Sequence, residues 1–142
     1  MIFPANGPVN PVQAIFDAMN TPGAVKIDWP QDITLNEYQR LAARTIRKDM
    51  GNVAMTNHAL HGMVSEIGEL HGLHQKVYQG HDFNEEHAKK ELGDALWFIA
   101  EYCTAHGWNL GDIGQMNIEK LKARYPEGFS EEKSLHRAEG DV

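Results

Sequence analysis

The chain has 142 residues, of which 42% are hydrophobic and 23% are charged, a composition that fits one globular domain with its own core. Its formal net charge of −7 argues against non-specific binding to a nucleic-acid polymer, which requires a basic face. No apolar run approaches the roughly 18 residues that a membrane span needs, and the start lacks the basic segment of a signal peptide.

Cys103 is the only cysteine, so no intrachain disulfide can form. Because disulfides mark oxidising compartments, the single cysteine favours a reducing, cytoplasmic setting. The lack of a long apolar run predicts no membrane partner. Cys103 stands at helical spacing beside Ile99 and Ala100, which predicts a packing role more readily than a reactive thiolate.

Residues 1–33 differ from the rest of the chain, because they contain five of the six prolines. Asn10 and Pro11 are a suitable N-cap and first position for a short helix over residues 11–19. We therefore predict a proline-containing N-terminal extension, whose function the sequence does not reveal.

The next helix begins after Thr34, an N-cap with Glu37 three residues on in the pattern of a capping box. Apolar residues then follow a helical course to Thr45. The other side of this helix is basic, with Arg40, Arg44, Arg47 and Lys48. A solvated face is the favoured interpretation, and approach to an anionic ligand is the alternative.

Three longer helices follow, over residues 57–78, 85–106 and 110–124, after a connector at 49–56. Gly80 and Gly107 are their stop signals, and Asn84 is an N-cap. Residues 125–129 form a turn, and residues 131–142 form a polar tail. Short connections between long helices predict an all-α fold, an antiparallel bundle of four main helices.

The second helix carries an apolar stripe that we expect to lie in the core: Leu60, Met63, Val64, Ile67, Leu70, His74 and Val77. The corresponding stripe of the third helix contains Ala88, Leu92, Ala95, Phe98, Ile99 and Tyr102.

An acidic pattern occurs twice, as Glu66-x-x-Glu69 on the second helix and Glu91-x-x-Asp94 on the third. Residues three apart share one side of a helix, so each pair presents two carboxylates to the same neighbour. Glu91 falls within the apolar stripe, where an ionised carboxylate is costly unless it is paired or metal-bound. Four such oxygen ligands suit one or two magnesium ions.

Gly68 and Gly93 each lie inside one of these acidic segments. A glycine in a helix interior costs roughly 0.5–1 kcal/mol relative to alanine. We therefore expect the two helices to approach each other closely at these glycines.

On the fourth helix, Asn117, Lys120 and Arg124 share a face. These side chains can donate hydrogen bonds to phosphate oxygens. A metal-activated water that attacks a phosphorus atom of a nucleotide is the reaction that these groups suit.

Other metal sites fit less well. No Glu-x-x-His occurs, which argues against a di-iron bundle, and the zinc pattern His-Glu-x-x-His is also absent. His58, His61, His71 and His74 invite a metal interpretation, but for His71 and His74 packing with a hydrogen bond is favoured.

These motifs resemble those of the MazG-like nucleoside triphosphate pyrophosphohydrolases, an all-α family with Glu-x-x-Glu followed on the next helix by Glu-x-x-Asp. The segments Leu35-Asn36-Glu37-Tyr38-Gln39 and Asn117-x-x-Lys120-Leu121-x-x-Arg124-Tyr125-Pro126-x-Gly128-Phe129 also resemble small members of the family. The resemblance covers residues 34–130, which are the predicted catalytic domain, and does not extend to residues 1–33.

The resemblance implies cleavage of a nucleoside triphosphate between its α and β phosphates, with Mg²⁺ as cofactor and Mn²⁺ as a substitute. Glu66, Glu69, Glu91 and Asp94 would be the metal-binding and catalytic acids. Asn117, Lys120 and Arg124 would bind the substrate. The resemblance also implies a homodimer or homotetramer in which neighbouring subunits help to complete the site.

The base of the substrate is not identified by these motifs. Trp29, Trp97, Trp108, Tyr38 and Phe83 are candidates for stacking on a base, although packing is favoured for each. Two other functions stay open at this point. One is a non-catalytic module that binds nucleotide or metal and acts as a regulator; the other is a helical interaction protein whose acids are merely solvated.

Overall fold

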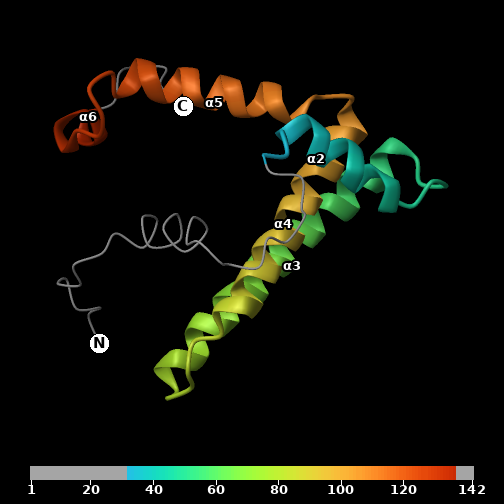
Figure 1. The fold of residues 1–142 in the computed structure, drawn as a ribbon, viewed down its shortest axis with the longest axis horizontal. Coiled ribbons are helices and arrows are strands. Elements are labelled where there is room, and N and C mark those ends of the chain that lie inside the picture. Colours follow the sequence, from blue (N-terminus) through green and yellow to red (C-terminus); the bar gives the residue numbers. More distant parts are fainter. Residues whose placement is uncertain (1–31, 137–142) are drawn as a thin grey trace, which may run out of the picture. The chain divides into compact units, whose positions relative to one another are not determined.

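The computed structural model describes residues 32–136 of the chain (Figure 1). This part contains five α-helices and one short 3-10 helix, and no strand occurs among the described residues. All of the helices belong to one unit, residues 33–142. The predicted all-α fold is confirmed. The short helix predicted over residues 11–19 lies outside the described residues.

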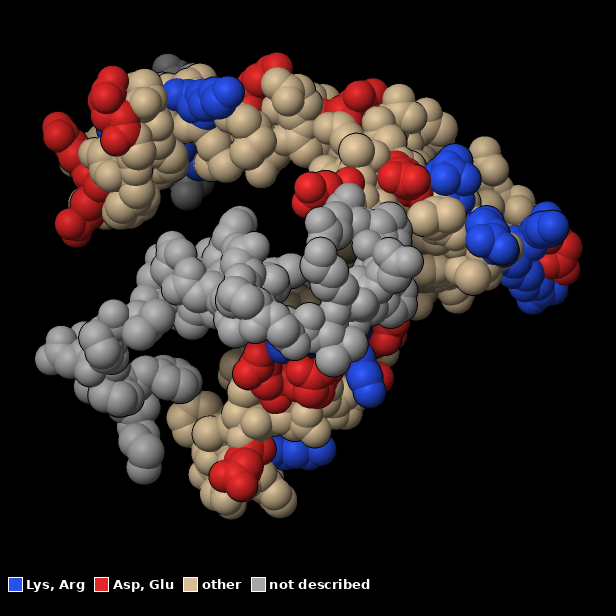
Figure 2. Space-filling model, viewed as in Figure 1, with Lys and Arg blue, Asp and Glu red and all other residues tan. Residues whose placement is uncertain are grey.

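Helix α2 spans Leu35–Ala42 and continues as the 3-10 helix η1, Ala43–Thr45. Its N-cap is Thr34, as predicted, because the Thr34 hydroxyl accepts a hydrogen bond from the backbone N–H of Glu37 at 3.2 Å. The basic side chains that follow are exposed at the connection between α2 and α3, where Figure 2 shows a group of positive charges. One of them, Arg47, forms an ion pair with Asp49.

Helix α3 spans Asn52–Tyr78 and begins earlier than the predicted start near Asn57. Gly51 is its N-cap in an extended conformation, so the predicted connector at 49–56 was wrong in its second half. The hydroxyl of Thr56 donates to the carbonyl of Asn52 at 2.8 Å, which lets a hydroxyl residue lie inside the first turns without disrupting the helix.

Helix α4 spans Glu85–His106 and helix α5 spans Leu110–Arg124, both as predicted. The side chain of Asn84 accepts from the N–H of His87, and Gly107 ends α4 in the left-handed conformation that favours glycine. A short helix α6, Glu131–Leu135, follows a Ser130 N-cap within the segment predicted to be a polar tail.

Helices α3 and α4 form a long antiparallel pair, and α2 packs against α4 and α5 (Figure 1). The start of α5 is held by side chains of α2. Gln39 accepts a hydrogen bond from Leu110 N at 2.7 Å, and Asn36 accepts one from Gly111 N at 2.7 Å. These bonds satisfy N–H groups that have no partner within the first turn of α5.

The core between the helices is built mostly from small side chains. Ala100, Cys103 and Leu110 form its centre, and Tyr38, Ala42 and Leu96 pack around them. Cys103 is buried, and burial raises the pKa of its thiol, so the packing role predicted for it agrees with the structure.

The large apolar side chains predicted to form the core stripe of α3 are largely exposed. Val64 is 75% exposed, Ile67 52% and Leu60 46%, whereas α3 buries only Ala59 and Leu73. The prediction was wrong for these residues because the buried face of α3 is a different one, which carries Ala59 and Leu73. A second apolar face of α3 is therefore left at the surface of the described chain.

The close approach predicted at Gly68 and Gly93 was also wrong. A Cβ atom added at either glycine would meet nothing within 4 Å. The contact occurs instead at Gly62 of α3, where an added Cβ would collide with the ring of Phe98 of α4. This contact lies one to two turns away from the acidic segments.

No helix in residues 32–136 combines the length and the apolar character that crossing a membrane requires.

Candidate metal centre

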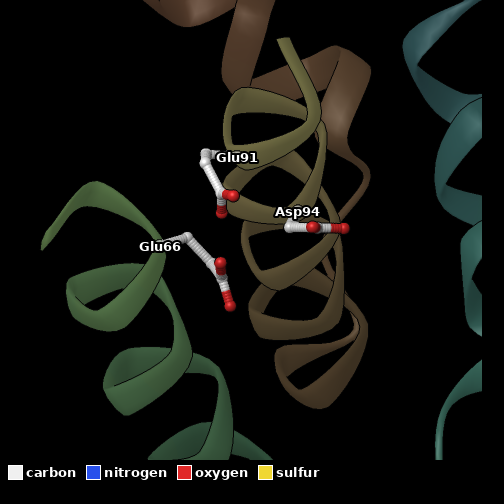
Figure 3. A group of neighbouring side chains, drawn as sticks. All are labelled: Glu66, Glu91 and Asp94. Atoms are coloured by element: carbon white, nitrogen blue, oxygen red, sulfur yellow. The ribbon is translucent and has the colours of Figure 1, made fainter. Parts of the chain in front are cut away.

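Three carboxylates from two helices converge between α3 and α4. Glu66 comes from α3, and Glu91 and Asp94 come from successive turns of α4. One carboxylate oxygen of each lies within 4.8 Å of those of the other two. Figure 3 shows Glu66 extending from α3 toward Glu91, with Asp94 beside them. The antiparallel pairing of α3 and α4 places the segment that carries Glu66 beside the segment that carries Glu91 and Asp94.

Glu91 is the anchored member of this group. It is 6% exposed, as expected from its place within the apolar stripe of α4. Its Oε1 lies 2.6 Å from Nε2 of His87, one turn earlier on the same helix. This contact restrains one oxygen of the carboxylate.

The neighbouring acids affect the pKa of Glu66. Burial and a hydrogen bond with Glu91 raise the pKa of Glu66, and the charges of Glu69, Asp94 and Glu91 raise it further. Burial also raises the pKa of Tyr38 on α2, with a contribution from the charge of Asp94. A cation bound among the three carboxylates would remove this repulsion.

Glu69 lies outside this group of three. It is exposed on α3, one turn beyond Glu66, and acts on Glu66 through its charge. The structure therefore brings together three of the four predicted acids.

Asn117, Lys120 and Arg124 lie on α5, whose main packing partner is α2 and not one of the acid-bearing helices. Asn117 and Lys120 are exposed, and the Arg124 guanidinium lies 5.9 Å from the centre of the Tyr125 ring. None of the three belongs to the cluster of acids.

The chemistry of the cluster suits a hard divalent cation. All three ligands are carboxylate oxygens, which Mg²⁺ and Mn²⁺ prefer, and no histidine or cysteine belongs to the cluster. Because an ionised Glu91 is buried beside two other acids, a shared cation would offset both its desolvation and the repulsion. The residues present therefore fit a magnesium ion.

Sequence reasoning missed two features of α4. One is His87, which its spacing of four residues before Glu91 could have revealed. The other is Glu101, a fully buried carboxylate in the next turns of the same helix. No motif singles it out.

Comparison with known proteins identifies the family of the chain. Residues 55–129 match the MazG nucleotide pyrophosphohydrolase domain, so the chain belongs to that family. The chain is also similar to the Gene 37 protein of Mycobacterium phage L5, with 26% identity over 85 residues that cover 56% of this chain and 75% of that protein. No solved structure matches the chain. The family predicted from the motifs is thereby confirmed.

Proposed function

We propose that the protein is a Mg²⁺-dependent pyrophosphohydrolase that cleaves (deoxy)nucleoside triphosphates between the α and β phosphates. The products are a nucleoside monophosphate and pyrophosphate. The observation that carries this proposal is the convergence of Glu66, Glu91 and Asp94 from two helices, in a chain of the MazG family.

In this proposal Glu66, Glu91 and Asp94 hold the metal, and Glu69 supplies a further carboxylate one turn along α3. Magnesium, when bound, neutralises phosphate charge and lowers the pKa of a bound water. One of the carboxylates would also orient the attacking water and accept its proton, while the bond from the α phosphorus to the pyrophosphate leaving group breaks. Mn²⁺ would serve the same ligands.

Lys120 and Arg124 would bind the phosphates of the substrate, and Asn117 would contact a phosphate or the sugar. Because α5 packs mainly on α2, we propose that these residues act in a homodimer or homotetramer, where a neighbouring subunit completes the site. The exposed apolar side chains of α3 and α4, among them Val64 and Leu92, support such an assembly, since a free apolar face of this kind favours a partner. Residues 34–130 would be the catalytic domain, and the unpaired cysteine is consistent with a cytoplasmic setting.

A panel of nucleoside triphosphates incubated with Mg²⁺ tests this function, with the products separated and identified. We expect pyrophosphate to be released and orthophosphate not to be. Chelation of the metal should stop turnover, and Glu91→Gln should lower kcat/KM at least about a hundredfold.

Glu132→Gln, on the exposed first turn of α6, is the matched control and should keep full activity. Turnover of no nucleotide would overturn the proposal, as would an unchanged rate in Glu91→Gln. Nucleotide binding without turnover would favour the regulatory module instead.

A further inference from the structure

Glu101 is the most deeply buried charged side chain of the described residues. It lies on α4 and is 1% exposed. Its Oε2 accepts a hydrogen bond at 2.8 Å from Nδ1 of His58, which belongs to α3. Its other oxygen, Oε1, is buried and has no hydrogen-bond partner among the residues that the structure describes.

This arrangement is unfavourable for stability. Burying a carboxylate is costly, and one hydrogen bond to a partly exposed partner recovers only part of that cost. An apolar residue of similar size would serve packing better at this position. The effect that distinguishes Glu101 from such a residue is its hold on His58.

His58 is fixed on several sides. Its ring centre lies 5.4 Å from that of Phe98 and 6.3 Å from that of Trp97, with an edge-on arrangement to Trp97. Trp97 is itself tied to η1, because its Nε1–H donates to the hydroxyl of Thr45 at 2.8 Å.

The His58 side chain is nevertheless 51% exposed. Since Nδ1 faces the buried carboxylate, the exposed edge of the ring is the one that carries Nε2. In the neutral imidazole Nδ1 holds the proton, so Nε2 is a hydrogen-bond acceptor in a fixed position.

The pair lies at a definite place relative to the acids. His58 precedes Glu66 by about two turns of α3, and Glu101 follows Asp94 by about two turns of α4. Because the helices are antiparallel, both displacements run in the same direction, over roughly 10–12 Å at 1.5 Å per residue. This separation is of the order of the length of a nucleoside.

We propose that His58 is a substrate-binding residue that contacts the nucleoside part of the triphosphate, and that Glu101 is the positioning residue that orients it. His58 Nε2 accepts a hydrogen bond from a donor on the nucleoside, either a base N–H group or a sugar hydroxyl. This inference rests on the proposed function, because it places the phosphates at Glu66, Glu91 and Asp94.

The test measures binding by titration calorimetry in the presence of Mg²⁺. One ligand is a nucleoside triphosphate with a methylene group between the α and β phosphates, and the other is inorganic tripolyphosphate, which has no nucleoside. In His58→Asn the amide nitrogen can still donate to Glu101, but the outward nitrogen is gone. We expect affinity for the nucleotide to fall about three- to tenfold, the equivalent of one hydrogen bond, and affinity for tripolyphosphate to stay unchanged.

Glu101→Leu should weaken nucleotide binding in the same way, whereas Glu101→Gln, which keeps an acceptor for Nδ1, should restore it. In the Glu101→Leu background, His58→Asn should have little further effect, because the two residues act as one unit. His61→Asn is the control, an exposed histidine of the same helix. If Glu101→Leu does not fold, the affinities of His58→Asn for nucleotide and for tripolyphosphate test the inference by themselves.

Nucleotides that lack one donor at a time then identify the contact. The loss caused by His58→Asn should disappear for a 2′-deoxynucleotide if the sugar hydroxyl is the donor, or for a base without an exocyclic amine if the base is. Equal losses for nucleotide and tripolyphosphate, or no loss for either, would overturn the inference while the wild type still hydrolyses nucleotides. A wild type that neither binds nor hydrolyses nucleotides would refute the proposed function itself.

Discussion

The two halves of the α3–α4 pair differ in how closely the helices pack. In one half, Gly62 lies against the ring of Phe98, and Ala59 is completely buried. In the other half, a Cβ atom added at Gly68 or Gly93 would meet nothing within 4 Å, and three acids converge in the same half as the buried Leu73 and Ala88. The open half leaves room for charged side chains beside the glycines.

Each half contains one buried glutamate that is bonded to a histidine. Glu91 lies beside two other carboxylates and contacts a histidine of its own helix, whereas Glu101 lies outside the cluster of acids and is bonded to a histidine of the opposite helix. The first needs a cation, because its neighbours repel it. The second is bonded through one oxygen to His58, and its other oxygen has no partner among the described residues. Burial alone does not identify a metal ligand; the charge of the neighbouring residues does.

The largest expected effect separates these two glutamates. Glu91→Gln should abolish the rise in Tm that Mg²⁺ produces in the wild type, because it removes a buried ligand. Glu101→Gln should retain that rise, because it lies outside the cluster of acids. Thermal unfolding with Mg²⁺ and with chelator measures both. Equal loss in the two variants would show that the difference between the halves has no bearing on metal binding.

The glycines provide the second test. Gly62→Ala should destabilise the protein by about 1–3 kcal/mol, because the added methyl group collides with Phe98. Gly68→Ala should stabilise it by about 0.5–1 kcal/mol, because the position is open and alanine is the better helix former. Urea unfolding measures the two free energies. Similar values for both variants would contradict the assignment of a tight and an open half.

The sequence predicted the helices α4 and α5 well because their ends carry strong local signals. Asn84 and Gly107 act through their own backbone surroundings, so no tertiary information is needed to place them. The start of α3 was misplaced because its N-cap, Gly51, has no side chain to make a capping hydrogen bond and was assigned to the connector. The acids were found because a spacing of three residues puts Glu91 and Asp94 on one side of any helix.

Other features could not be predicted because they depend on which faces meet. Periodicity identified an apolar stripe on α3 that includes Val64, but not whether that stripe faces α4 or the surface. The same limit applies to Gly68, since a glycine in a helix does not reveal what lies opposite it. Glu101 and His58 are 43 residues apart, and only the pairing of the helices brings them together.

A smaller effect is expected at His87. The His87→Ala substitution removes the donor that orients Glu91 and should weaken Mg²⁺ binding about tenfold, in line with the loss of other groups that support metal ligands. Titration of Mg²⁺ against initial rate gives the apparent affinity. His87→Gln, which keeps a polar side chain near Glu91, should have a Mg²⁺ affinity between those of the wild type and His87→Ala. An unchanged Mg²⁺ affinity in His87→Ala would show that Glu91 does not depend on His87.

The smallest effect concerns the charge of Glu66. Its pKa is raised above its ordinary value of 4.5, so without metal the ionised form costs stability at neutral pH, and this cost disappears as the pH falls below the ordinary value. In the presence of chelator, the Tm of Glu66→Gln should therefore be a few degrees above that of the wild type at pH 7. Near pH 4 the two Tm values should be equal. With Mg²⁺ the order at pH 7 should reverse, because the wild type gains a ligand that glutamine does not replace. Thermal unfolding at the two pH values, with and without Mg²⁺, measures these differences. A Glu66→Gln variant less stable than the wild type in chelator would mean that repulsion among the acids does not govern the open half.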